Sequence, residues 1–162
     1  MIKKTNVLFV CLGNICRSPT AHGVFQTLVN RENLDQQIMV DSAGTGDWHL
    51  GHAPDKRTST VASDRGYDLS ELRARLVKPS DFEDFDYIVA MDHENMRNLR
   101  AMEPEGFKGE LCLLLDHSIS PDFAQYEEVP DPYYGGGDGF GLVLDLVEDA
   151  CVGLLAHVRA EA

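Results

Sequence analysis

The chain has 162 residues, with 27 acidic against 14 basic side chains and a formal net charge of −13. This length predicts a single domain over residues 1–162 with its own hydrophobic core. The acidity argues against nucleic acid as a partner, because such binding depends on Lys and Arg that neutralise phosphates. No stretch is apolar enough to span a membrane and no signal-peptide pattern opens the chain, so we expect a cytoplasmic protein.

Apolar runs typical of strands alternate with helical periodicity along the chain. Strands are predicted at 7–10, 38–40, 87–91 and 111–115, and helices at 18–29, 55–65, 93–102 and 138–158. Continuous apolar strands separated by helices indicate an α/β fold with a parallel sheet covered on both faces. Ligands bind beyond the carboxyl ends of the strands in such sheets, so we expect the functional residues there.

The first strand ends at Cys11, in the segment with the clearest chemical pattern. Six positions separate Cys11 from Arg17, which suits a loop that surrounds one phosphate. Backbone N–H groups of residues 12–17 can point inward, and a helix that starts with Ser18 as N-cap and Pro19 adds its positive dipole end. That field favours a Cys11 thiolate, a nucleophile directed at phosphorus.

Other residues of this loop fit the same interpretation. Gly13 and Asn14 tolerate left-handed backbone, which a loop with inward amides requires. Cys16 has two open interpretations: a packed residue of the first helical turn, or a partner that forms a reversible disulfide with Cys11 and limits its over-oxidation. A buried structural thiol is the alternative for Cys11 itself, and the neighbouring Arg17 and helix start disfavour it.

The two other cysteines are predicted in the core. Cys112 falls within the fourth strand and Cys151 within the last helix, both in apolar surroundings. Four cysteines with two in one loop do not resemble a disulfide framework, and no Cys/His spacing indicates zinc. We therefore predict neither a metal nor a cofactor.

A phosphate monoester attacked by a thiolate needs a proton for its leaving group, and Asp131 is the best candidate donor. Two flanking prolines hold this residue in an extended turn. The same carboxylate would then activate water against the cysteinyl-phosphate. Tyr133 and Tyr134 follow it and can form a wall that grips an aromatic ring. A simple turn is the alternative, which the Cys11 loop disfavours.

Taken together, these segments resemble the low-molecular-weight protein tyrosine phosphatases in order and over nearly the whole chain. The resemblance rests on residues 10–19, 41–48, 90–92 and 131–134. It implies a four-stranded parallel sheet flanked by helices, with the phosphate-binding loop after the first strand. It also implies hydrolysis of phosphotyrosine in protein substrates. No metal should be required, because Arg17 and the loop amides already neutralise the phosphate.

The resemblance assigns roles position by position. It makes Cys11 the nucleophile, Arg17 the bidentate clamp on the phosphoryl oxygens and Asp131 the general acid and base. The residues that bind phosphate or support its loop are Leu12, Gly13, Asn14, Ile15, Cys16, Ser18 and Ser42. The aromatic residues at the mouth of the pocket are Trp48, Tyr133 and Tyr134.

The chain departs from the family pattern at Leu72, where many members carry a histidine that braces the phosphate loop. Leucine cannot make that hydrogen bond, so we expect the loop to be supported differently. Arg73 and Arg75 are interpreted as a solvated basic face. Asp92 is interpreted as a helix N-cap, a role compatible with orienting the site.

Two other activities on the same fold are alternatives. A protein arginine phosphatase would accept a guanidinium phosphate, whereas the bulky Ile15 favours a flat phenyl ring. An arsenate reductase would need further cysteines placed to relay a disulfide, and Cys112 and Cys151 do not meet that need. A silent phosphate-binding module gives no reason for Cys11 and Asp131 to occur together.

The monomer is the favoured oligomeric state.

Overall fold

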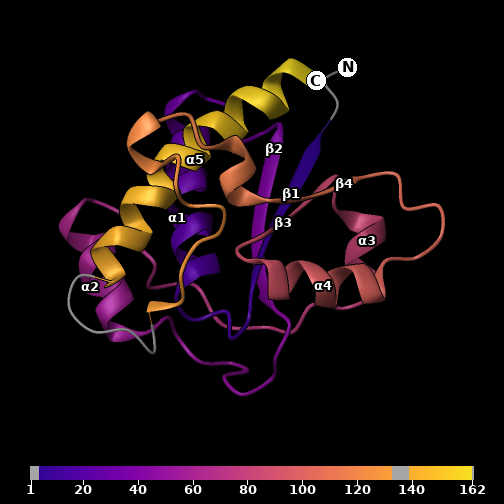
Figure 1. The fold of residues 1–162 in the computed structure, drawn as a ribbon, viewed down its shortest axis with the longest axis horizontal. Helices are drawn as coiled ribbons and strands as arrows, with labels where there is room; N and C mark the ends of the chain where they lie inside the picture. The colour runs from indigo at the N-terminus through magenta and orange to yellow at the C-terminus, as the bar shows by residue number, and fades with distance from the viewer. Residues whose placement is uncertain (1–3, 133–138, 162) are drawn as a thin grey trace.

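The fold is described for residues 4–132 and 139–161 by a computed structural model. One parallel sheet has the order β2-β1-β3-β4, and its strands are β1 (Thr5–Cys11), β2 (Ile38–Gly44), β3 (Tyr87–Ala90) and β4 (Glu110–Leu113). On one side lie α1 (Arg17–Arg31), α2 (Lys56–Asp64) and α5 (Gly139–Glu161); on the other lie α3 (Asp81–Asp84) and α4 (His93–Met102) (Figure 1). The predicted α/β fold, with helices on both faces, is confirmed.

Strand β1 is central and its side chains alternate between two cores. Val7 and Phe9 pack with residues of α1 and α5, whereas Leu8 and Val10 pack with residues of α3 and α4. All four are completely buried, which explains their continuous apolar run. Because β1 is paired with β2 and β3 on its two edges, its carboxyl end at Cys11 is held from both sides.

The first helix begins earlier than its sequence indicates. Helix α1 starts at Arg17 with Cys16 as the N-cap, and no side chain caps its first amides. The prediction that Ser18 is the N-cap is therefore wrong. Its hydroxyl is directed at the Cys11 sulfur instead, 3.0 Å away.

The fourth strand is shorter than predicted because the chain turns at its end. Strand β4 stops at Leu113, and residues Leu114–His117 form a 3-10 turn, η1, that packs against α5. The Asp116 carboxylate accepts a hydrogen bond from the Leu113 amide at 3.1 Å, which stabilises the turn. A second 3-10 turn, η2 (Pro121–Phe123), lies in the loop that follows.

The last helix, α5, covers the sheet beside α1 and extends to Glu161, beyond the predicted end at 158. Cys151 on this helix and Cys112 on β4 are both buried, as predicted. No helix within the described parts of the chain has the length and apolar character needed to cross a membrane.

Candidate active site

The loop between β1 and α1 is held from outside through its carbonyl groups. Leu12 O accepts a hydrogen bond from Gly46 N at 2.8 Å, and Ile15 O accepts one from Asp55 N at 2.9 Å. With these carbonyl groups engaged outside, the amides of the loop are left for the enclosed space, and that of Asn14 is directed at Cys11 Sγ. This is the arrangement of a backbone anion site, with the positive end of α1 beside it.

Gly13 and Asn14 in this loop, and Gly44 at the end of β2, fit their positions for different reasons. Asn14 has a φ of 57°, the left-handed conformation that the sequence predicts. Gly13 does not adopt a positive φ, contrary to the expectation. Glycine fits this position for a steric reason, since a Cβ there would lie 2.9 Å from His49 Cδ2. At Gly44 a Cβ would lie 2.7 Å from Leu12 O, so only glycine allows β2 to approach the loop.

The Cys11 sulfur receives two donors at the base of the loop. The amide of Asn14 donates to Sγ at 3.3 Å, and Ser18 Oγ lies 3.0 Å from Sγ. Asn14 Nδ2 donates to Ser18 Oγ at 2.7 Å, so the hydroxyl proton of Ser18 is available for the sulfur. A second acceptor for this proton, Ala43 O, lies farther away, at 3.4 Å. This network stabilises negative charge on Cys11.

Arg17 is almost completely buried beside the sulfur. Its Nη1 donates to Asp92 Oδ2 at 2.6 Å and to Val129 O at 3.1 Å, and its Nη2 lies 3.6 Å from Asp131 Oδ2. Burial alone would lower the pKa of Arg17, but the charges of Cys11, Asp92 and Asp131 raise it above the usual value. The guanidinium therefore carries a permanent positive charge into the pocket.

Asp92 serves two elements at once. Its Oδ1 accepts the Asn95 amide at 2.7 Å, and the Asn95 side chain accepts the Asp92 amide at 3.2 Å, which closes a capping box on α4. Its Oδ2 holds Arg17. Both interpretations made from the sequence, the helix cap and the orienting role, are confirmed.

The loop that carries Asp131 is fixed immediately before this residue. The buried Val129 donates its amide to Met91 O at 2.8 Å and offers its carbonyl to Arg17. The side chain of Asp131 is 31% exposed, which leaves it in contact with solvent at the pocket edge. Substrate and water can therefore both reach this carboxylate.

These elements enclose a pocket of about 290 Å³. The residues that line it are Cys11, Leu12, Gly13, Ile15, Cys16, Arg17, Trp48, His49 and Asp131. The described part of this pocket has no group of three convergent metal ligands. An anion held by the loop amides and Arg17 is the ligand that the pocket suits best.

One side of the mouth is aromatic. Trp48 is 69% exposed, yet its ring packs on Gly46, where a Cβ would lie 2.0 Å from a ring carbon. His49 also lines the pocket, and sequence reasoning missed it. Tyr133 and Tyr134, which were also predicted at the mouth of the pocket, lie outside the described residues.

Comparison with known proteins shows which family the chain resembles in sequence and fold. Residues 6–162 match the profile of the low molecular weight phosphotyrosine protein phosphatases. The chain belongs to this family. YfkJ of Bacillus subtilis, named a low molecular weight protein-tyrosine-phosphatase, is 44% identical over 158 residues, which are 96% of this chain and 97% of the relative.

Solved structures agree with this assignment. A protein tyrosine phosphatase from Entamoeba histolytica, with Hepes in its active site, superposes with a TM-score of 0.91 at 40% identity, covering 98% of this chain and 99% of the other. The Drosophila arginine phosphatase DARP has a TM-score of 0.86 at 33% identity, covering 94% and 97%. The chain is therefore a phosphoric monoester hydrolase by family.

In this phosphatase the loop is supported differently, as the leucine at position 72 predicts. Leu72 packs against the apolar core, and Asn14 Oδ1 instead accepts the backbone amide of Arg75 at 3.0 Å. The Arg75 guanidinium pairs with Asp41 and Asp81, each at 3.0 Å. Arg75 therefore has a structural role in these ion pairs, which corrects the prediction that it belongs to a solvated basic face.

Ser42 contacts a histidine side chain on α1. Its hydroxyl lies 3.0 Å from His22 Nδ1, so it contacts the helix behind the phosphate loop. Burial lowers the pKa of His22, an effect that the Asp41 carboxylate only partly opposes. His22 was missed from the sequence, although it lies one helical turn after Ser18.

Cys16 is buried against the same pocket as Cys11. Burial raises the pKa of its thiol to about 12. At neutral pH it is therefore a thiol and not a competing nucleophile. Its redox role stays a prediction.

Proposed function

We propose that this phosphatase hydrolyses phosphotyrosine in protein substrates through a cysteinyl-phosphate formed on Cys11. Phosphoproteins are the substrates that the family implies. The observation that carries the proposal is the convergence of three side chains on one pocket: Cys11, Arg17 and Asp131. A thiolate, an anion clamp and a proton donor are the groups that two-step phosphoryl transfer requires.

In the first step, Arg17 holds the phosphate and Cys11 attacks it. Arg17 Nη1 is occupied by Asp92 and Val129, so the Nε and Nη2 edge is the one that can bind two phosphoryl oxygens. The S–P bond forms as the bond from phosphorus to the phenolic oxygen breaks. Asp131 gives its proton to the departing phenoxide.

In the second step, water releases the phosphate. The Asp131 carboxylate takes a proton from water, whose oxygen attacks phosphorus. The S–P bond breaks and its electron pair returns to Cys11, where the Ser18 hydroxyl stabilises the thiolate. Inorganic phosphate leaves and Asp131 is protonated for the next cycle. Because Arg17 and the loop amides neutralise the phosphate, we expect no metal requirement.

The pocket walls favour an aryl phosphate. Ile15 presents a branched apolar side chain inside the pocket, and Trp48 offers an aromatic surface at its edge. A flat phenyl ring fits between such surfaces better than a guanidinium, which would lose hydration without a matching carboxylate. Arsenate reduction is disfavoured because Cys112 and Cys151 are both buried, and burial raises the pKa of each thiol.

The decisive experiment compares matched phosphotyrosine and phosphoarginine peptides. We expect kcat/KM to favour phosphotyrosine by about tenfold or more, the scale on which pocket shape discriminates substrates. Cys11→Ser serves as the inactive control, and a chelator should leave the rate unchanged. A preference for phosphoarginine would contradict the proposed substrate while leaving the Cys11 chemistry intact.

A further inference from the structure

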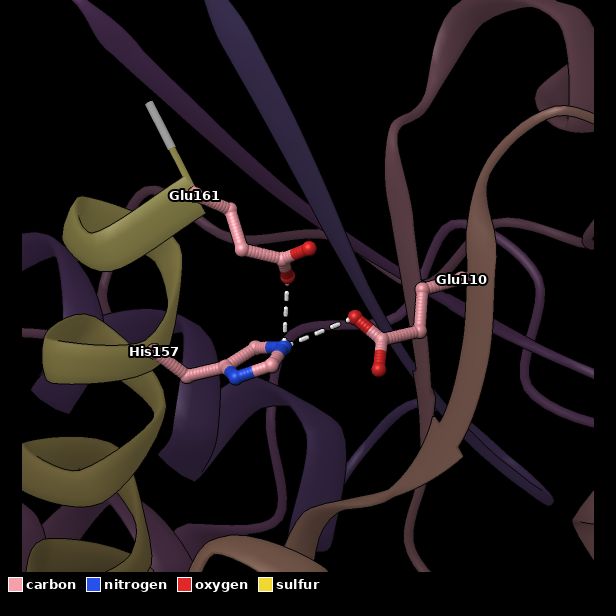
Figure 2. A group of neighbouring side chains, drawn as sticks. All are labelled: Glu110, His157 and Glu161. Carbon is pink, nitrogen blue, oxygen red and sulfur yellow. Dashed lines mark hydrogen bonds and ion pairs between the residues drawn. The ribbon is translucent and has the colours of Figure 1, made fainter.

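Three side chains converge on one point near the end of α5, away from the catalytic pocket (Figure 2). His157 Nε2 lies 2.9 Å from Glu110 Oε2 and 2.7 Å from Glu161 Oε1. The three potential ligand atoms all lie within 4.8 Å of one another. One imidazole nitrogen carries at most one proton, so two carboxylates compete for a single N–H. We propose that Glu110, His157 and Glu161 bind a divalent transition metal, with Zn²⁺ as the best-suited ion.

The backbone brings these ligands together from two elements. His157 and Glu161 are one helical turn apart on α5 and therefore share a face. Glu110 is the first residue of β4, so the site joins the last turn of α5 to the amino-terminal edge of the sheet. The phosphate loop leaves the opposite edge, about 20 Å away along the seven residues of β1. A metal here would be independent of the catalytic chemistry.

Neighbouring side chains orient two of the three ligands. Tyr87 donates its hydroxyl to Glu161 Oε1 at 2.8 Å. The Tyr87 ring also packs edge-on to His157, with ring centroids 5.9 Å apart. On the other side, the His117 ring lies 4.8 Å from the His157 ring. Such outer contacts hold metal ligands in position.

The donor set indicates which ions fit. One imidazole nitrogen and two carboxylate oxygens suit borderline metals, and Zn²⁺ commonly takes three protein ligands with water in the fourth position. The side chains of Glu110, His157 and Glu161 are 42%, 34% and 51% exposed, so a cation and its water can reach them. Zn–ligand bonds of about 2.0–2.2 Å place ligand atoms about 3.0–3.5 Å apart. The two nitrogen–oxygen distances, 2.9 and 2.7 Å, would therefore have to open slightly, and the two carboxylate oxygens, which lie within 4.8 Å of each other, would have to approach.

Sequence patterns do not reveal this site because its ligands are far apart in the chain. Glu110 and His157 are 47 residues apart, so no local Cys/His spacing marks them. Only the pair His157 and Glu161, at helical spacing, gives a local signal. Metal binding would tie the end of α5 to β4 and stabilise the folded state by mass action.

The test is a calorimetric titration of Zn²⁺ into the Cys11→Ser variant, which lacks the competing active-site thiolate. We expect one equivalent to bind, and His157→Gln to weaken that binding more than tenfold. Tyr87→Phe should weaken it about tenfold, the usual effect of removing an outer hydrogen bond. The matched control is His93→Gln, because His93 is also a surface histidine beside a carboxylate, Glu127, at 3.9 Å; this variant should bind as the parent does.

A second readout locates the ion directly. In nitrogen-15 spectra of the histidine side chains, one equivalent of Zn²⁺ should shift the His157 ring signals and leave those of His93 in place. In the background that retains Cys11, His157→Gln should keep its hydrolytic rate, which shows that the variant is folded. Absence of Zn²⁺ binding, or an affinity unchanged by His157→Gln, would overturn the proposal.

Discussion

Arg17 and Asp92 form a nearly buried ion pair, with Nη1 and Oδ2 2.6 Å apart. The pair joins the phosphate loop to the first turn of α4, two segments 75 residues apart in the chain. Since one edge of the guanidinium is bound in this way, the other edge is presented to the pocket. Asp92 thus positions the guanidinium of Arg17, the proposed phosphate clamp.

Two substitutions of Asp92 separate its roles. Asp92→Asn keeps a good N-cap and removes the charge, so kcat/KM should fall about 10²-fold as Arg17 loses its orientation. Asp92→Ala also loses the cap and should be about 1 kcal/mol less stable than Asp92→Asn. Steady-state kinetics and urea unfolding check both effects. Wild-type kinetics in both variants would show that Arg17 is oriented without Asp92.

Replacing Arg17 by Lys tests the clamp. Lysine keeps the charge but cannot hold two phosphoryl oxygens in one plane, so kcat/KM should fall by about 10²–10³-fold. Arg73→Lys is the matched control, since Arg73 is exposed and, among the residues that the structure describes, donates to the backbone carbonyls of Ser70 and Leu72. Equal rates for the two variants would refute bidentate binding by Arg17.

The role of Asp131 as proton donor predicts a dependence on the leaving group. Asp131→Asn should lower the rate of phosphoenzyme formation by about 10²–10⁴-fold for substrates whose phenoxide is a poor leaving group, and much less for nitrophenyl phosphates. Rapid-mixing measurements over a series of aryl phosphates test this difference. A uniform loss across the series would mean that Asp131 does not protonate the leaving group.

His22 predicts a specific loss of stability in acid. Burial lowers its pKa from the ordinary value of 6.5, so the unfolded chain takes up a proton before the folded one does. The free energy of unfolding should therefore be highest above pH 6.5 and decrease as the pH falls below it. His22→Gln can keep a hydrogen bond with Ser42 and should flatten this decrease. Urea titrations at several pH values would contradict the account if both proteins show the same slope.

Peroxide tests the relation between Cys11 and Cys16. Oxidation of the Cys11 thiolate gives a sulfenic acid, which the Cys16 thiol can convert to a disulfide with loss of water. We expect mass spectrometry to find this bridge and the activity to return with a reductant. In Cys16→Ser, oxidation should proceed to the irreversible sulfinic acid. A Cys11 sulfinate without a bridge in the wild-type protein would exclude protection by Cys16.

Local patterns allowed the catalytic loop to be predicted from sequence. Cys11, Arg17 and the apolar strand before them lie within a few residues of one another, so their order alone indicates a strand, an anion loop and a helix. Asp92 was recognised as a cap because its partner, Asn95, is equally near. The confirmed parts of the prediction are mainly those decided by such short-range patterns.

Long-range contacts made through the backbone explain what was missed. Asn14 is supported by the amide of Arg75, a group that almost any residue can supply, so no side-chain pattern reveals it. Serine is a residue type that often caps helices, but the Ser18 hydroxyl contacts the Cys11 sulfur instead of the helix amides. His49 lines the pocket with its ring against Gly13, where a Cβ would lie 2.9 Å from Cδ2.

The central claim is that phosphate is transferred to Cys11 before water releases it. The most direct measurement is to mix Asp131→Ala with p-nitrophenyl phosphate, quench in acid and map the phosphoryl group by mass spectrometry. This substrate needs little protonation, whereas hydrolysis of the intermediate still needs the missing base. We expect a phosphoryl group to accumulate on Cys11, together with a burst of nitrophenol. Continued turnover with no covalent phosphate, or phosphate on any residue other than Cys11, would contradict it.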